Sequence, residues 1–476
     1  MFHRGAKRNM TSDKINRRDI LKRGGAAGLG LWAASNGLPA FAQDAAPAEL
    51  EMPQGQAGTL TVIHRTEYFE AAQNLFRDTV SKFAAANNVQ LDISTTNPES
   101  FGDFLGKMSA AVRAGNPPDI AYTSTVSIPQ MHLLGLLEDV NDVVEEAISR
   151  YGNVMRGINA ESIGKIDGRW VAVPYIANTT GTFFRADKLK EKGIDPMTLE
   201  TWEQRREAAL AISDPDNGFY GWGLTVNQSG DGWGVASAIL NAFGGHFTDE
   251  TGTKVEFDSP ETVAAFEFVR ETYDRNGKYA AMLPPGVESW GDISNNEAWL
   301  AGSVGYTHNA FSLYAAAKRD NNPVFPNTVL LPQPRANNGD HRNGGAVGGW
   351  LTVFKGAPNA ELAKKLALEL LDPANFTPIS SVAGGLFMPA YENLWTDELI
   401  AADPNYAIIK EQVDIEDPFI GPSWPAKPAA QIDAIRAQGV LEQSMGNVIS
   451  GRMTSEEAVK DAHNKIVQIF EEGGIL

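Results

Sequence analysis

The opening of the folded chain predicts an α/β fold, because short β-branched runs alternate with amphipathic segments. The runs at 59–63, 89–93 and 119–122 have the composition of buried strands. Between them, 72–83 and 105–114 repeat apolar residues at helical spacing. A β-α-β-α-β order indicates a largely parallel sheet. Ligands of such sheets lie at the carboxyl ends of the strands.

Later segments follow the same two periodicities. The predicted strands are 170–174, 180–184 and 304–307, the predicted helices are 202–212, 260–276, 295–301, 361–371 and 455–471, and 329–334 is a proline-rich extended segment. Because Trp, Gly and Asn concentrate in 218–245, we expect that stretch to be rich in loops. Trp170 and Trp202 are interpreted as core residues.

Residues 1–42 have the pattern of an export signal. Several basic side chains precede 24–43, which carries no charge. Gly, Ser and Asn dilute this stretch, whereas a membrane-spanning helix needs roughly 20 strongly apolar residues. The pair Arg17-Arg18 resembles the twin-arginine motif of signals that export folded proteins, and we expect cleavage after Ala42. The alternative is an ordinary signal with an incidental arginine pair.

Composition limits the compartment and the partners. The sequence has no cysteine, which excludes disulfides, thiolate ligands and a lipidated cysteine anchor. Taking the signal's eight basic and two acidic residues from the totals of 40 and 59 leaves a net charge of −25 for 43–476. Such a chain repels nucleic acid and anionic lipid. We therefore expect a soluble, monomeric protein of the periplasm that binds no nucleic acid.

Several short motifs occur in order along most of the remaining chain. They are Ala114-Gly-Asn-Pro-Pro-Asp-Ile120, Leu134-Gly-Leu-Leu-Glu-Asp139, Ile166-Asp-Gly-Arg-Trp-Val-Ala-Val-Pro-Tyr175, Arg185-Ala-Asp-Lys-Leu189 with Gly193-Ile-Asp-Pro196 and Thr201-Trp202, and Ser450-Gly-Arg-Met-Thr-Ser-Glu-Glu-Ala458. Each is a weak signal alone, but their order and spacing are specific. With them the chain resembles the extracellular solute-binding proteins of ABC importers, in the carbohydrate-binding branch that includes maltose-binding protein.

The resemblance implies a two-lobed periplasmic-binding-protein fold, each lobe a sheet flanked by helices, with a hinge and an interdomain ligand cleft. The chain would cross between the lobes near 174–178, 330–334 and 371–376. The implied organisation is a signal (1–42), a linker (43–58), an N-terminal lobe (59–176 with 333–373) and a C-terminal lobe (177–332 with 374–476). It also implies capture of a sugar, oligosaccharide, glycoside or polyol and its delivery to ABC permease subunits at the inner membrane.

Candidate ligand contacts follow from this resemblance and from the chemistry of sugars, which need paired donors and acceptors and favour aromatic faces. They lie in loops after strands that face the ligand, in a Gly-flanked loop and in a glycine-rich segment before a tryptophan. The candidates are His64, Glu67, Tyr68, Ser124, Thr125, Asn178, Gln228, Asp231, Trp233, Asn309, Phe311, Gly349, Trp350 and Trp424. Core packing is the alternative for the aromatic members.

Two other functions remain open. A periplasmic enzyme acting on glycosides would need two opposed carboxylates, and no local motif marks such a pair. Neither a Gly-x-Gly-x-x-Gly nor a Gly-x-Ser-x-Gly motif occurs, and the seven histidines are scattered. We therefore expect no enzymatic activity, cofactor or metal. A polyamine or other non-sugar solute is the alternative ligand.

Overall fold

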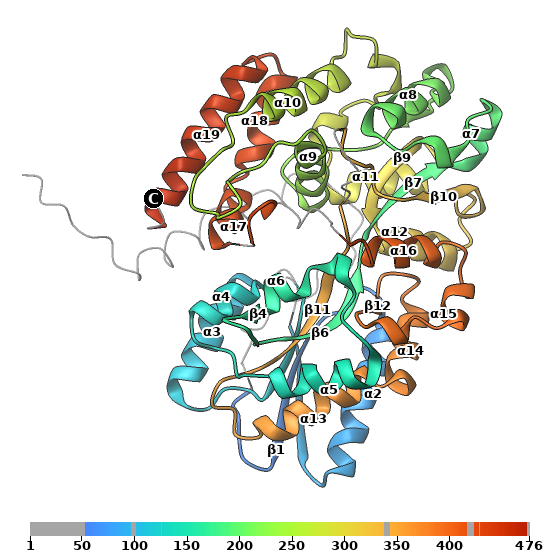
Figure 1. Cartoon of the computed structure of the whole chain (residues 1–476). Coiled ribbons are helices and arrows are strands. Elements are labelled where there is room, and N and C mark those ends of the chain that lie inside the picture. The colour runs from blue at the N-terminus through green and yellow to red at the C-terminus, as the bar shows by residue number, and fades with distance from the viewer. Residues whose placement is uncertain are drawn as a thin grey trace, which may run out of the picture.

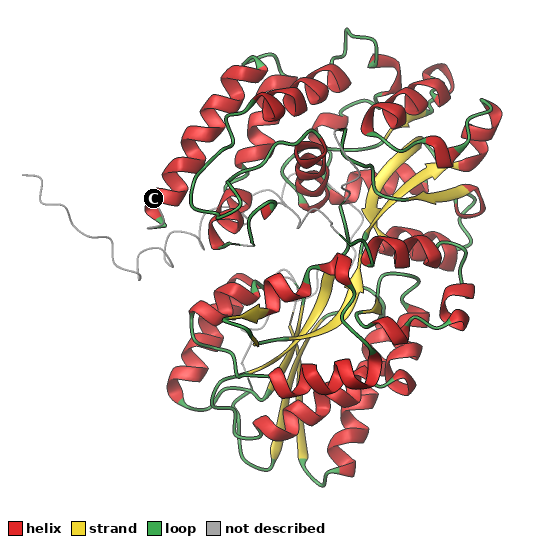
Figure 2. Cartoon of the chain, viewed as in Figure 1, coloured by secondary structure: helices red, strands yellow, loops and turns green. Residues whose placement is uncertain are grey.

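The computed structural model describes residues 53–96, 101–124, 126–337, 343–416, 423–427 and 429–473. The chain forms two lobes, each a β-sheet flanked by helices (Figures 1 and 2). The predicted signal, most of the linker and the candidate Thr125 lie outside these ranges. Within the ranges, no helix combines the length and the apolarity needed to cross a bilayer.

The first lobe contains a six-stranded sheet in the order β12-β6-β11-β3-β1-β2. The strands are β1 (Thr59–Arg65), β2 (Gln90–Thr96), β3 (Ile120–Thr123), β6 (Val173–Asn178), β11 (Ala346–Val353) and β12 (Met388–Pro389). β1 runs parallel to β2 and β3, as predicted from the opening alternation. The expectation of a largely parallel sheet was wrong, however, because β11 lies antiparallel to β3 and β6, and β12 antiparallel to β6. β11 enters the sheet from the other lobe and so runs against its neighbours.

Helices cover both faces of this sheet (Figure 2). They are α2 (Glu70–Ala86), α3 (Phe101–Ala114), α4 (Ile128–Leu133), α5 (Asn141–Tyr151), α6 (Ala160–Gly164), α13 (Ala360–Leu371) and α14 (Pro373–Val382). The helical spacing predicted α2 correctly, with Phe76 and Val80 buried on its inner face. The predicted strand at 170–174 is two strands, since β5 (Arg169–Trp170) pairs with β4 (Lys165–Ile166) before β6 begins.

The second lobe contains a four-stranded sheet in the order β10-β7-β9-β8. The strands are β7 (Thr180–Arg185), β8 (Tyr220–Trp222), β9 (Val304–Ala310) and β10 (Thr328–Leu331). The surrounding helices are α7 (Ala186–Glu191), α8 (Trp202–Ile212), α9 (Gly230–Ala242), α10 (Pro260–Tyr273), α11 (Asp292–Leu300), α12 (Phe311–Arg319), α17 (Ala430–Ala437), α18 (Val440–Ile449) and α19 (Ser455–Glu472). The predicted core residues Trp170 and Trp202 are 2% and 0% exposed.

The stretch 218–245, expected to be mostly loop, instead contains β8 and the 13-residue helix α9. The helix was not predicted because three of the first five residues of α9 are glycines, and glycine is a poor helix former. Tertiary burial compensates, since the last eight residues of α9 are all buried. Ser229 caps the helix by accepting a hydrogen bond from the Gly232 amide.

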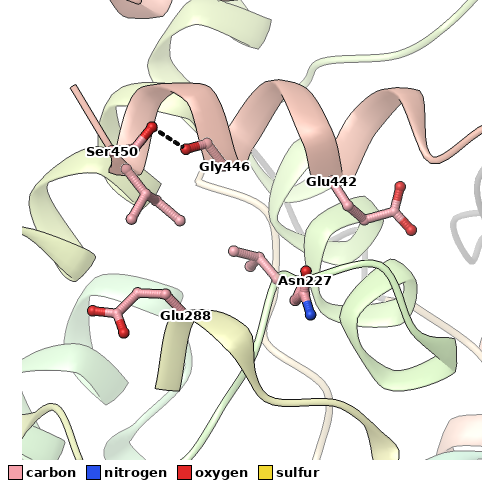
Figure 3. Close-up of a pocket in the computed structure, with 7 residues that line it drawn as sticks. Asn227, Glu288, Glu442, Gly446 and Ser450 are labelled. Atoms are coloured by element: carbon pink, nitrogen blue, oxygen red, sulfur yellow. Dashed lines mark hydrogen bonds between the residues drawn. The ribbon is translucent and has the colours of Figure 1, made fainter. Parts of the chain in front are cut away.

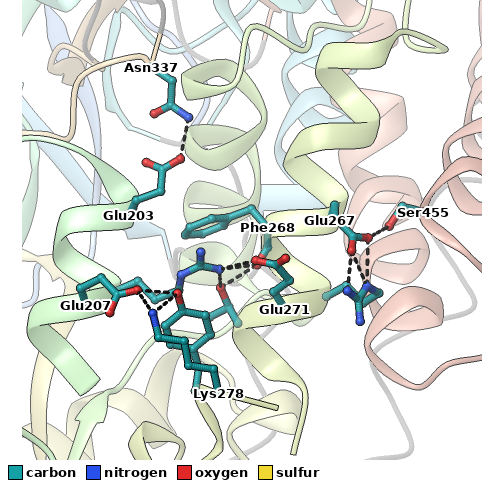
Figure 4. Close-up of polar contacts among 12 residues, drawn as sticks. Glu203, Glu207, Glu267, Phe268, Glu271, Lys278, Asn337 and Ser455 are labelled. Carbon is teal, nitrogen blue, oxygen red and sulfur yellow. Dashed lines mark hydrogen bonds and ion pairs between the residues drawn. The ribbon is translucent and has the colours of Figure 1, made fainter. Parts of the chain in front are cut away.

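Polar contacts join the helices of the second lobe and fasten the connection toward β11 (Figure 4). Lys278 reaches Glu207 of α8, and Ser455 of α19 donates to Glu267 of α10 at 2.9 Å. The Asn337 side chain donates to Glu203 of α8 at 2.8 Å. The start of the connection from β10 to β11 is therefore held by the second lobe.

Two of the predicted crossings occur where expected, from β6 to β7 and from β10 to β11. The segment 371–376, predicted to be a third crossing, joins α13 to α14, and both helices pack against α2 of the first lobe. β12 then extends the first-lobe sheet. The structure thus keeps residues 374–389 with the first lobe, whereas the sequence had suggested that the second lobe resumes at 374. Two further helices, α15 (Asp397–Ala401) and α16 (Tyr406–Val413), follow β12.

A polar cavity between the lobes as the candidate functional site

A cavity of about 210 Å³ lies where the two lobes meet beside the crossings. The first lobe contributes the end of β6 and the segment leading into β11, and the second lobe contributes α9 and β9. The lining residues are Asn178, Thr179, Thr180, Gly230, Asp231, Gly234, Val235, Ser237, Ala238, His308, Gln333, Asn343, Gly344, Gly345 and Ala346. Two residues predicted from sequence, Asn178 and Asp231, are brought together here from opposite lobes.

Asp231 is the only carboxylate among the described lining residues. Its Oδ2 accepts hydrogen bonds from the side-chain amides of Asn295 at 2.8 Å and Asn309 at 3.0 Å. Burial raises the pKa of Asp231 to about 6, and the hydrogen bond from Asn295 partly opposes that rise. The two amides fix the orientation of an acceptor that titrates just below neutral pH.

The amino terminus of α9 is already satisfied by the protein's own side chains. The amides of Gly230 and Asp231 donate to the two carboxylate oxygens of Asp292, at 3.2 and 2.8 Å. The Gly232 amide donates to Ser229 Oγ at 2.9 Å. Free amides at a helix amino terminus favour binding of an anion. Here these amides are already hydrogen-bonded, and the carboxylates of Asp231 and Asp292 lie next to them.

His308 and Gln333 give the cavity neutral polar groups. His308 Nε2 lies 2.5 Å from the Tyr306 hydroxyl, and burial holds the pKa of His308 well below its usual value. The Gln333 side chain donates to the Thr180 carbonyl at 2.7 Å. The Asn178 side chain packs against the backbone of Gly348. A Cβ atom on Gly348 would lie only 2.6 Å from the side-chain nitrogen of Asn178. These side chains offer hydrogen bonds without net charge.

The aromatic side chains predicted as ligand platforms are packed inside the lobes. Trp233 is 5% exposed and stacks on Phe247, with ring centroids 6.0 Å apart. Trp350 is buried against Gly164, and Phe311 is fully buried beside Phe183. Their loop-like sequence surroundings suggested exposure, but α9, β11 and α12 place these rings on inner faces.

The candidates that follow β1 and β3 form a separate group that does not line the cavity. His64 is buried, and since Arg77 can only donate to Nε2, the ring proton lies on Nδ1 and is donated to the Arg65 carbonyl. Arg65 also donates to Ser124 at 2.5 Å and pairs with Glu67 at 3.5 Å. Burial raises the pKa of Glu67, whose side chain is 3% exposed. Tyr68 is exposed and packs edge-on against Phe69.

The remaining candidates lie near the cavity without lining it, or away from it. Asn309 is buried behind Asp231. Gln228 is exposed and lies against Gly439. Gly349 lies against the Tyr122 ring, and a Cβ atom on Gly349 would lie only 2.5 Å from that ring. Trp424 is half-buried and contacts His246 edge-on.

Sequence reasoning missed Thr179, Ser237, His308, Gln333 and Asn343 as lining residues. Gln333 lies in a predicted crossing, so the crossing itself was a usable signal. No sequence signal identifies Ser237 or His308 as a lining residue, because Ser237 lies inside α9 and His308 lies inside β9. Their positions became apparent only from the way these elements face the first lobe.

A second cavity, of about 310 Å³, lies wholly within the second lobe between α18 and the loops before α9 and α11 (Figure 3). Apolar Val226 and Ile449 form part of its wall, and Glu442 lines one end. Burial raises the pKa of Glu442 to about 7. All of its described lining residues belong to the second lobe, so among them none comes from the first lobe. Within the described ranges, no three His, Asp or Glu side chains are grouped closely enough to hold a metal ion.

Known relatives are similar over parts of the chain. The maltotriose-binding protein of Pyrococcus abyssi is 26% identical over 211 residues, which is 42% of each chain. The mannitol-binding protein of Pseudomonas aeruginosa is 32% identical over 134 residues, 27% of this chain and 28% of that protein. The chain thus matches less than half the length of these curated relatives.

The fold is shared over a longer span. A solute-binding protein of an ABC transporter from Thermotoga lettingae, solved with α-D-tagatose, superposes with a TM-score of 0.66 at 20% identity, covering 87% of this chain and 99% of that one. The sequence profile of the bacterial extracellular solute-binding proteins matches residues 78–408. That match spans both lobes and well over half of the sequence. The chain therefore belongs to the bacterial extracellular solute-binding proteins.

Proposed function

We propose that this protein captures a carbohydrate, in the broad sense of a sugar, glycoside or polyol, in the cavity between its lobes. The observation that carries the proposal is the polar lining of that cavity, to which Asn178 contributes from one lobe and Asp231 from the other. Amide, hydroxyl, imidazole and carboxylate groups match the many donors and acceptors of a sugar. Relatives that bind maltotriose and mannitol support the same class of ligand.

A ligand bound here would contact both lobes and so favour the closed arrangement over the open one. Binding shifts a conformational equilibrium only when the ligand interacts better with one state. The crossing from β6 to β7, at 178–180, gives a few residues at element ends that can absorb a rotation. We propose that the closed, loaded protein is the form presented to the permease subunits of an ABC importer.

Binding without turnover separates this function from that of an enzyme. In a thermal-shift assay, a ligand that binds only the native state raises the melting temperature. We expect such a shift with at least one member of a panel of sugars and polyols, and no release of sugar from a parallel panel of glycosides. Release of sugar would show a glycoside-acting enzyme instead. A shift with polyamines alone would contradict the carbohydrate assignment.

The family and the amino-terminal sequence support an exported protein. We propose that the protein is exported by the twin-arginine route, is cleaved after Ala42 and acts as a soluble monomer in the periplasm. Changing Arg17 and Arg18 together to lysine should leave the full-length chain in the cytoplasm. Mass spectrometry of the periplasmic fraction reads out the cleavage, and an intact Met1 there would contradict it.

A further inference from the structure

The cavity between the lobes has no aromatic wall among the described residues. None of its described lining residues is Trp, Tyr or Phe. Of the nine tryptophans after the signal, seven are at most 5% exposed, and these are Trp170, Trp202, Trp222, Trp233, Trp299, Trp350 and Trp395. Trp290 and Trp424 are half-buried and lie outside the lining. Among the described lining residues, a chain of sugar rings would therefore find no flat aromatic surface on which to stack.

The same lining disfavours an anionic ligand. It includes no described lysine or arginine, and its one carboxylate is Asp231. The amides at the start of α9 are bound to Asp292 and Ser229, so they are not free to hold a phosphate. Among the described lining residues, a phosphate group would meet the negative charges of Asp231 and the adjacent Asp292 without a compensating cation.

Size and hydrogen bonding point to a compact neutral ligand. The volume of about 210 Å³ is below the roughly 300–1,000 Å³ typical of pockets for drug-sized molecules. Asn178, Ser237, His308 and Gln333 surround Asp231 with neutral polar side chains. Vicinal hydroxyls can donate to the carboxylate and accept from the neighbouring amides.

We propose that the cavity selects a neutral polyol of a single unit, either an alditol or a monosaccharide, over oligosaccharides and over sugar phosphates. In this proposal the Asp231 carboxylate accepts hydrogen bonds from the ligand's hydroxyl groups. This selectivity rests on the proposed carbohydrate-binding function and narrows it. Asn295 and Asn309 act as positioning residues, because they orient the carboxylate from outside the lining.

Calorimetry on the processed protein with mannitol, ribitol, glucose, maltotriose, glucose 6-phosphate and spermidine tests the selectivity. We expect the tightest binding from mannitol, ribitol or glucose, with maltotriose and glucose 6-phosphate at least tenfold weaker. Tightest binding of maltotriose or of the phosphate overturns the selectivity while the carbohydrate function stands. Binding of spermidine alone, or of none of these compounds, overturns both.

Variants test the assigned residue. With the neutral ligand that binds most tightly, Asp231→Asn should weaken binding at least tenfold, because an amide oxygen accepts a weaker hydrogen bond from a hydroxyl group than a carboxylate does. Glu271→Gln is the matched control, since this half-exposed carboxylate of the same lobe pairs with Arg206 away from the cavity. Should Asp231→Asn fail to fold, Asn178→Ala tests the cavity from the other lobe and should also lower affinity tenfold. Unchanged affinity in the folded cavity variants would refute the assignment.

Discussion

At the scale of single residues, Asp119, the acid of the motif 114–120, holds several elements together. Its fully buried carboxylate accepts hydrogen bonds from the backbone amide and hydroxyl of Thr61, both at 2.8 Å. It also accepts from the backbone and side-chain amides of Asn359, at 2.8 and 3.1 Å. One side chain thereby joins β1, β3 and the start of α13.

Removing this carboxylate leaves several buried donors without partners. We expect Asp119→Ala to lower the free energy of unfolding by about 3 kcal/mol or more, since hydrogen bonds to a charged group are among the stronger ones. Urea denaturation measures the loss. Asp142→Ala, at a largely exposed carboxylate of the same lobe, is the control and should change stability little.

Asp231 should make stability depend on pH. Its pKa of about 6 in the folded protein lies above the ordinary aspartate value of about 3.9, so the fold disfavours the ionised form. The folded state is relatively favoured below pH 4, and that advantage is lost as the pH rises through 6. A rise of about two pKa units corresponds to about 3 kcal/mol. The unfolding free energy of Asp231→Asn, relative to that of the wild type, should therefore rise between pH 4 and pH 6 and level off above that range. Parallel curves across this range would contradict the raised pKa.

Residue-level reasoning named two of the residues that line the candidate cavity, Asn178 and Asp231. They could be named because the resemblance places ligand contacts just past the first crossing and in a Gly-flanked loop, and binding residues often lie in loops. Trp233 and Trp350 could not be assigned, because composition does not tell on which side of an element a ring lies. Core packing and ligand stacking both favour large aromatic surfaces.

At the scale of elements, glycines decide how closely α8 approaches β8. A Cβ on Gly221 of β8 would lie 1.8 Å from the backbone oxygen of Ala209 in α8. Backbone atoms inside a packed helix cannot move aside easily. Gly446 of α18 is the opposite case, since its Cβ position has no neighbour within 4 Å.

Two alanine substitutions should therefore act in opposite directions. We expect Gly221→Ala to destabilise the second lobe by about 3 kcal/mol or more, at the upper end of overpacking effects. Gly446→Ala should stabilise by about 0.5–1 kcal/mol, because alanine favours the helix. Chemical denaturation of both variants compares them directly. A Gly221→Ala variant as stable as the wild type would mean that the close contact with α8 does not limit this site.

Element prediction succeeded where local pattern and tertiary burial agreed. The strands β1, β2 and β3 and the helices α2, α8 and α19 combine clear periodicity with end signals such as the capping box of Thr454 and Glu457. Helix α9 was missed because its glycine-rich start argues for a loop, while burial of its apolar remainder overrides propensity. The orientation of β11 could not be derived either, since it depends on a return of the chain from another lobe.

At the scale of the whole molecule, the connection from β10 to β11 is fastened at its second-lobe end. Gln333 bonds to Thr180, Arg335 pairs with Glu200 at 2.9 Å and Asn337 bonds to Glu203. These contacts move with the second lobe. The described part of this connection, up to Asn337, therefore stays with the second lobe.

Rotation between the lobes should be visible when a ligand fills the cavity, because the lining residues come from both lobes. We expect small-angle X-ray scattering to show a smaller radius of gyration at saturating ligand than in its absence. The ligand should also raise the unfolding free energy, by about 2.7 kcal/mol at one hundred times its dissociation constant. Asp231→Asn should need a higher ligand concentration for the same change in radius. A stabilised protein whose radius stays constant would mean that ligand binds without moving the lobes.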